Sequence, residues 1–90
     1  MNKLFMICSL HVKLARTVLG LTQDQLAEKS FVSPQTIKKI ELTNPNEELK
    51  NNKSTIIALM KFFEDEGVEF IDDDNEVGVK IGTEVIKEKF

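Results

Sequence analysis

The sequence predicts a small, mainly α domain in which four helices are followed by a β-hairpin. Three observations lead to this fold class. Helix-capping signals mark two short helices between residues 21 and 42. Apolar residues recur at helical spacing before and after that stretch. After Gly67 the apolar period changes to two, which is typical of strands. A chain of 90 residues has room for one hydrophobic core.

The composition fits a globular chain and excludes several classes of protein. Hydrophobic residues make up 41% of the chain, enough for a small core. The single cysteine, Cys8, rules out an intramolecular disulfide and a cysteine-based zinc site. The apolar run over residues 4–10 is followed by no small-residue cleavage site, and no run approaches the ~18 apolar residues of a membrane span. We therefore expect a cytoplasmic protein.

The charges are unevenly distributed along the chain. Residues 1–63 carry nine Lys and Arg against five Asp and Glu, a net charge of +4. Residues 64–90 carry three Lys against ten Asp and Glu, a net charge of −7. The first part can approach a polyanion, whereas the acidic tail is repelled by one. Alternatively, the tail serves only solubility.

The first helix is predicted from Ser9, a possible N-cap, to a stop at Gly20. An apolar stripe at four-residue spacing runs along it: Leu10, Leu14 and Val18. Residues 1–8 show no clear periodicity. They can form a strand, an arm or an extension of this helix.

Two more helices follow, over residues 23–29 and 34–42. Thr22 and Gln25 form a capping-box pattern at the start of the first one. Ser33 can cap the second one, with Pro34 at its first position, where the missing N–H has no cost. Expected core residues are Leu26, Ala27, Ile37 and Ile40. Two short helices separated by residues 30–32 predict a helix-turn-helix.

A polar loop over residues 43–53 precedes a fourth helix, which Ser54 can cap and Gly67 ends. Its apolar stripe consists of Ile56, Leu59, Met60 and Phe63. Strands are predicted over residues 68–71 and 77–81, with a turn at residues 72–76. A two-stranded hairpin is marginal alone, so it must pack on the helices or pair with another chain. Residues 83–90 form a short helix or fray.

Residues 23–41, QDQLAEKSFVSPQTIKKIE, resemble the helix-turn-helix of Cro/repressor-type transcription regulators of bacteria and phages. The resemblance covers about residues 9–66, and the segments GVEFI and GVKI are similar to a short subgroup with a C-terminal β-hairpin. It implies a four-helix lambda-repressor-like DNA-binding domain over residues 1–66. Residues 67–90 would then be an acidic β-hairpin and tail of the same domain, and its dimerisation element.

One residue departs from the family pattern. Family members usually have Gly in the turn, where the backbone is left-handed, and this chain has Phe31. A non-Gly residue at positive φ costs roughly 1 kcal/mol. Either packing of the ring compensates a strained turn, or the backbone takes a different path.

The resemblance also implies a set of DNA-contacting residues. The third helix would enter the major groove with its N-terminal end towards the bases. Gln can read adenine and Lys can donate to guanine. Base contacts are expected from Ser33, Gln35, Thr36, Lys38 and Lys39, and phosphate contacts from Gln23, Lys50 and Lys53. Each of these residues can instead be an ordinary solvated side chain. By the same resemblance, Arg16 and Glu41 would form a structural salt bridge.

No pattern in the sequence indicates catalysis, a cofactor or a metal site. His11 has no neighbouring ligand pattern, and we expect it on the surface or in a helix cap. Cys8 is expected to act as a small hydrophobe. The acidic turn at residues 72–76 lacks the Gly and the terminal Glu of a calcium-binding EF-hand, which favours a solvated turn.

Two functions are therefore open. The first is sequence-specific binding of double-stranded DNA by a homodimeric transcription regulator. The second is a protein-interaction adaptor or antitoxin-like module, whose acidic hairpin engages a basic partner. The modest +4 of residues 1–63 favours the second, and the helix-turn-helix pattern favours the first.

Overall fold

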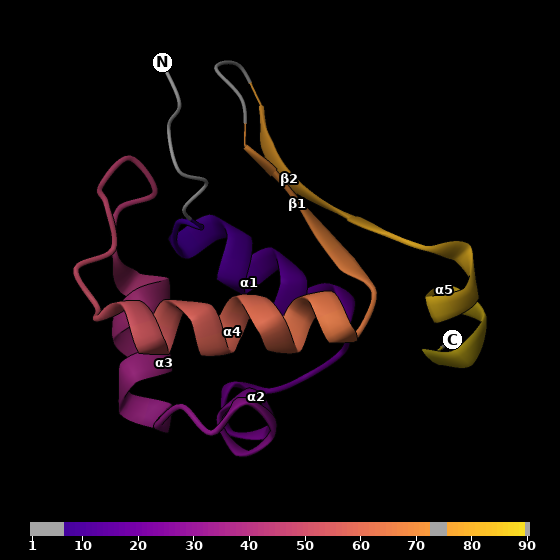
Figure 1. Cartoon of the computed structure of the whole chain (residues 1–90), viewed down its shortest axis with the longest axis horizontal. Helices are drawn as coiled ribbons and strands as arrows, with labels where there is room; N and C mark the ends of the chain where they lie inside the picture. The colour runs from indigo at the N-terminus through magenta and orange to yellow at the C-terminus, as the bar shows by residue number, and fades with distance from the viewer. Residues whose placement is uncertain (1–6, 73–75, 90) are drawn as a thin grey trace.

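The computed structural model describes residues 7–72 and 76–89. Over these residues the chain forms a compact, mainly α domain with a C-terminal antiparallel hairpin, as predicted (Figure 1). The elements are α1 (Ser9–Val18), α2 (Gln23–Ser30), α3 (Pro34–Leu42), α4 (Lys53–Asp65), β1 (Val68–Asp72), β2 (Val77–Ile81) and α5 (Thr83–Lys89). Predictions for residues 1–6 and for turn residues 73–75 lie outside the described part.

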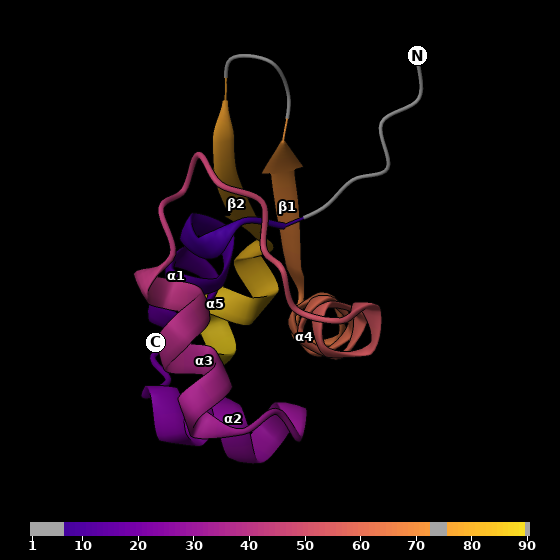
Figure 2. The same cartoon turned by 90° about the vertical axis from the view of Figure 1, so that its left-hand side faces the viewer.

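The core lies where α4 crosses the first three helices. α3 packs on α1 and α2, and α4 contacts α2 and β1. The hairpin lies on the opposite side of α1 and α4 from the α2–α3 pair, as Figures 1 and 2 show. Fully buried apolar side chains from the first four helices and β1 fill the centre: Val12, Leu26, Ile37, Ile40, Leu59, Phe63 and Val68. The molecule is thus divided into an α2–α3 end and a hairpin end.

The buried face of α1 is not the apolar stripe that the sequence shows. The buried apolar residues at this helix are Val12, Ala15 and Leu19, whereas the stripe formed by Leu10, Leu14 and Val18 is only half-buried. The reason is tertiary, because α3 and β2 both pack on α1 and their positions decide which face is covered. The start also shifts by one residue: Cys8 is the N-cap and Ser9 is the first helical residue.

The predicted start of α4 was also wrong. Asn52, and not Ser54, is its N-cap, and the Oδ1 of Asn52 accepts a hydrogen bond from the Thr55 N–H at 2.9 Å. The hydroxyl of Ser54 is itself bonded to that Oδ1, at 2.8 Å. Of the predicted stripe, Ile56, Leu59 and Phe63 are buried, while Met60 is half-buried. Gly67 follows the helix with a φ of +88°, as a C-terminal stop requires.

The hairpin packs on the helices. β1 and β2 are antiparallel, with Val68 opposite Ile81 and Asp72 opposite Val77. The ring of Phe70 lies edge-on to that of Phe63, with centroids 6.0 Å apart. After β2, residues 83–89 form α5, so the helical alternative for this segment is the one observed. No helix in the described part of the chain is long and apolar enough to cross a membrane.

Candidate nucleic-acid interface

The starts of α2 and α3 are fixed by their own side chains. Thr22 Oγ1 accepts from the Gln25 N–H at 3.0 Å, and Gln25 Oε1 accepts from the Thr22 N–H at 2.9 Å, which completes the predicted capping box. Ser33 Oγ accepts from the Thr36 N–H at 3.2 Å. Pro34 occupies the first position of α3. These local bonds satisfy N–H groups that a helix start otherwise leaves unpaired, and they set the direction of both helices.

The turn between the two helices is left-handed. α2 runs one residue further than predicted, to Ser30, whose hydroxyl donates to the Leu26 carbonyl at 2.7 Å. Phe31 follows with φ 63° and ψ 26°, and its side chain is 95% exposed. The backbone therefore takes the path that glycine would favour, and packing of the ring does not compensate the strain. The first interpretation, a strained turn compensated by packing, is right about the turn and wrong about the packing. The second, a different backbone path, is not observed.

The outward face of α3 is polar and cationic. Ile37 and Ile40 are buried beneath it, whereas Gln35, Lys38 and Lys39 are exposed, as predicted from the helical period. The side chains of these three residues make no hydrogen bond to another described residue. The two hydroxyls of the predicted set are engaged with each other, since Ser33 Oγ donates to Thr36 Oγ1 at 2.8 Å. Gln35, Lys38 and Lys39 are therefore the donors that this face presents.

Arg16 and Glu41 form the expected ion pair. Nε of Arg16 lies 2.7 Å from Oε2 of Glu41, and Nη2 donates to Oε1 at 2.9 Å. The side chains are 18% and 5% exposed, respectively. Arg16 Nη1 also donates to the Leu21 carbonyl at 2.9 Å, so the pair ties α1 and the start of α2 to the end of α3.

The ion pair between Arg16 and Glu41 determines which charges of α3 stay unpaired. The hydrogen bond to Glu41 raises the pKa of Arg16, the attraction of the carboxylate charge raises it further, and partial burial opposes both. Glu41 is the only acidic residue in the helix sequence PQTIKKIEL. Because its charge is paired with Arg16, Lys38 and Lys39 remain as the uncompensated charges of α3.

A shallow hollow beside α3 brings residues of three helices together. It is lined by Lys13, Arg16, Gln23, Lys38, Glu41 and Leu42. The predicted phosphate-contacting Gln23 and the predicted base-contacting Lys38 thus share one surface. Gln23 Nε2 already donates to Glu41 Oε1 at 3.1 Å, which leaves part of its amide for a ligand. Lys13 was not among the predicted residues, although its position three residues before Arg16 places both on one helix face.

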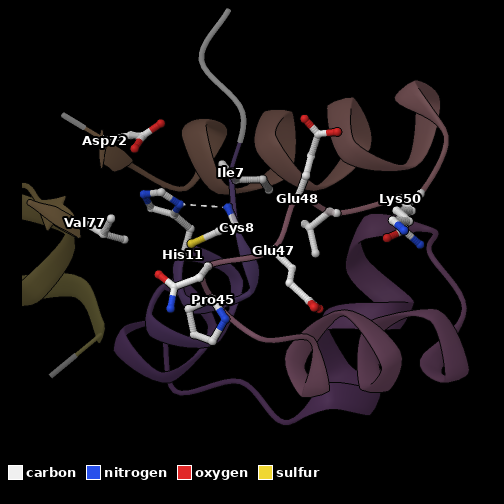
Figure 3. A pocket seen from close by; sticks show the side chains of 12 residues that line it. Ile7, Cys8, His11, Pro45, Glu47, Glu48, Lys50, Asp72 and Val77 are labelled. Atoms are coloured by element: carbon white, nitrogen blue, oxygen red, sulfur yellow. Dashed lines mark hydrogen bonds between the residues drawn. The ribbon is translucent and has the colours of Figure 1, made fainter. Parts of the chain in front are cut away.

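The other two predicted phosphate contacts lie elsewhere. Lys50 is in the loop that follows α3, and Lys53 is the first residue of α4. Gln35 lies in the first turn of α3, so most of the length of that helix, about 10 Å, separates it from this loop. Lys50 lines a different cleft with Cys8, His11 and Asp72 (Figure 3). The structure therefore does not bring Lys50 or Lys53 next to Gln35.

His11 is buried, and its predicted position on the surface was wrong. The Cys8 N–H donates to His11 Nδ1 at 3.0 Å, which confirms the alternative of a capping role. Nε2 lies 2.7 Å from the Ile71 carbonyl and acts as the donor, since Nδ1 is the acceptor. The imidazole therefore connects the start of α1 to β1. Cys8 itself is half-buried.

The acidic groups near the hairpin form no metal cluster within residues 7–72 and 76–89. Asp73 and Asp74 of the acidic turn lie outside the described residues. Comparison of the chain with protein-family models and with curated proteins found no match. The arrangement of α2 and α3 is therefore the observation from which we infer function.

Proposed function

We propose that this protein binds double-stranded DNA sequence-specifically, as a transcription regulator of the Cro/repressor type with a lambda-repressor-like arrangement of helices. One observation carries the proposal. α3 follows a helix and a turn, begins at a fixed cap, and presents Gln35, Lys38 and Lys39 to solvent. Its only carboxylate, Glu41, is paired with Arg16 and does not repel a phosphate backbone.

In this proposal, α3 lies in the major groove with its N-terminal end towards the bases. Gln35 donates to N7 and accepts from N6 of adenine, and Lys38 and Lys39 donate to guanine O6 and N7. Each good bidentate pair discriminates against the wrong base by about 1–3 kcal/mol. Ser33 and Thr36 contribute less, because their hydroxyls already bond to each other.

The hollow beside α3 holds the backbone of one strand. Lys13 is an exposed cation along it, and the free part of the Gln23 amide faces the same space. These groups position the duplex and carry no sequence information. Lys50 and Lys53 contact phosphates further along the duplex, beyond the C-terminal end of α3.

The active species is a homodimer. One recognition helix reads few base pairs, and two-fold pairing places two helices about 34 Å apart on successive half-sites. The two described strands form a two-stranded sheet, so each has an edge without a neighbouring strand. Such edges invite pairing with another chain. Sedimentation equilibrium of the full chain is expected to give a dimer, and a monomer bound to a single half-site would contradict this.

Selection of bound sequences from random duplex DNA tests the function. We expect enrichment of two half-sites with a fixed spacing. Gln35→Ala should relax the base preference at one position of each half-site, and Lys38→Ala should weaken binding. Lys87→Ala is the matched control, because it removes one exposed lysine from α5, away from α3. Failure of any sequence to enrich would overturn the proposal.

The second candidate is a protein-interaction module, and the C-terminal part favours it. Val77 and Ile86 are 45% and 42% exposed in the acidic segment that follows α4. Apolar side chains among carboxylates suit a basic protein partner. A co-purifying basic protein, together with no DNA binding at low salt, would favour this candidate over the first.

A further inference from the structure

Phe31 combines two features that do not stabilise the fold. It is the only non-glycine residue with positive φ in the described part of the chain. Its side chain is also the most exposed of the large hydrophobic ones there, at 95%. An aromatic ring in water contributes nothing to the core, and a left-handed backbone is unfavourable for a residue with a Cβ. Strained residues of this kind persist most often where a ligand uses them.

The position of Phe31 in the chain indicates the surface to which it belongs. It lies two residues before Ser33, the cap of α3, and four residues before Gln35. Figure 1 shows the α2–α3 turn at the end of the molecule opposite strands β1 and β2. The neighbouring Val32 is buried, so the backbone at the turn is anchored while the ring is left in solvent. Phe31 therefore belongs to the same end of the molecule as the first turn of α3.

The surroundings of the ring favour DNA over protein as its ligand. The core of a protein interface is a cluster of apolar side chains. The other exposed large hydrophobic residues are Leu42, Ile57, Val77 and Ile86, which lie at the far end of α3 or on other elements. Around the turn the exposed side chains are polar or charged, namely those of Glu28, Lys29, Ser33 and Gln35. A single ring among such groups suits a duplex, which offers isolated apolar methyl groups among phosphates.

We propose that Phe31 determines specificity for thymine, by packing its ring on the C5-methyl group of a thymine next to the base that Gln35 reads. The inference rests on the proposed DNA binding and deepens it. Thymine is the base that carries a methyl group in the major groove, and apolar side chains including Phe distinguish it there. The left-handed turn holds the ring outward before binding, so little ordering is needed when the duplex arrives.

Three variants at this position separate the ring from the backbone. Phe31→Gly and Phe31→Asn both suit the left-handed turn and remove the ring, whereas Phe31→Leu keeps an apolar side chain. The probe is the fluorescein-labelled duplex that the wild-type chain selects from random DNA. We expect dissociation constants about tenfold higher for the Gly and Asn variants, or about 1.4 kcal/mol. Phe31→Leu should stay within about threefold of wild type.

Thermal unfolding provides the structural readout. Phe31→Gly should unfold at the wild-type temperature or above it, because relief of strain at positive φ offsets the greater flexibility of the unfolded chain. A loss of DNA affinity without a loss of stability is not expected of a residue that only shapes the turn. If the Gly variant were instead less stable and equally weak with every duplex, Phe31 would be structural and the inference overturned.

Replacing single thymines of the duplex by uracil completes the test, since uracil lacks the methyl group. At one position per half-site, this change should weaken the wild-type chain several-fold and leave Phe31→Gly unaffected. Equal binding of wild type and Phe31→Gly to all duplexes would overturn the inference alone. Absence of wild-type binding to any duplex would overturn the proposed function as well. Loss of a co-purifying protein from the Gly variant, with DNA binding intact, would reassign Phe31 to a protein partner.

Discussion

The two ends of the molecule are held together by different kinds of interaction. At the α2–α3 end, the bonds that fix the helix starts join residues three apart, such as Thr22 to Gln25 and Ser33 to Thr36. At the hairpin end, the bond from His11 to the Ile71 carbonyl joins residues 60 apart in the chain. The proposed DNA-binding surface is thus built mainly from local signals, whereas the hairpin depends on long-range contacts.

The Arg16–Glu41 pair is the main exception at the α2–α3 end, and breaking it should have the largest effect. Glu41→Lys leaves Arg16 beside a second cation in a largely buried position. Removing one partner of a buried pair costs about 3–5 kcal/mol, and we expect about 3 kcal/mol here because Arg16 is partly exposed. Urea denaturation of the variant and of wild type measures this loss in the free energy of unfolding.

The matched control for Glu41→Lys is Glu28→Lys on the exposed side of α2. It makes the same change of charge without breaking an ion pair. It should leave the free energy of unfolding within about 0.5 kcal/mol of wild type. The double variant Arg16→Glu with Glu41→Lys should recover part of the loss. Equal stability of Glu41→Lys and wild type would mean that the pair does not hold α3.

His11→Ala should loosen the hairpin end selectively. It removes the donor to the Ile71 carbonyl and the acceptor for the Cys8 N–H, and it leaves a gap beside Phe70, whose ring centroid lies 5.5 Å from that of His11. We expect a loss of about 2–3 kcal/mol. Hydrogen exchange should then rise in β1 and β2 more than in α2 and α3.

His11→Gln is the conservative control for this position. Its amide offers an acceptor oxygen and a donor nitrogen on the same carbon, so it can replace both bonds of the imidazole in part. It should lose less stability than His11→Ala. If the alanine variant raised exchange equally at both ends of the molecule, the hairpin would not be a separately held unit.

Alanine substitutions at two glycines, Gly67 and Gly20, allow the two ends of the molecule to be compared directly. Gly67 and Gly20 have φ values of +88° and +72°. A Cβ on Gly67 would lie 2.5 Å from Val85 Cγ2, whereas one on Gly20 would meet nothing within 4 Å. Gly67→Ala should cost about 2 kcal/mol from strain and overpacking, and Gly20→Ala about 1 kcal/mol or less from strain alone.

Thermal unfolding of both alanine variants, and of Gly67→Ala combined with Val85→Ala, measures this difference. The double variant removes the side chain that the new methyl group would strike, and it should approach the cost of Gly20→Ala. Equal costs for the two single variants would show that α5 does not constrain the end of α4.

Prediction from the sequence also differs between the two ends: local features were predicted, and features that depend on long-range contacts were not. The capping box of α2, the cap of α3 and the outward position of Gln35 and Lys38 follow from local spacing, and all are observed. The buried face of α1 was missed, because periodicity shows that a helix has apolar stripes and not which of them another element covers. His11 was misplaced because its partner, Ile71, is far away in sequence.

The candidate site shows the same limit. The helical period places Lys38 and Lys39 outward over Ile37 and Ile40. It does not show that Gln23 is partly engaged by Glu41, or that Lys13 lines the same hollow as Lys38. Nor does it show that Phe31 keeps a left-handed turn with its ring in solvent, since the two alternatives were a turn compensated by packing of the ring and a different backbone path.

The salt dependence of DNA binding tests the central proposal most directly. Affinity of the wild-type chain for its selected duplex is measured over a range of salt concentrations. Each phosphate contact releases counterions, so about five contacts give a slope of log affinity against log salt of about −4 to −5. We predict a slope in that range. Absence of binding at low salt, or an affinity that does not change with salt, would contradict a DNA-binding surface built on α2 and α3.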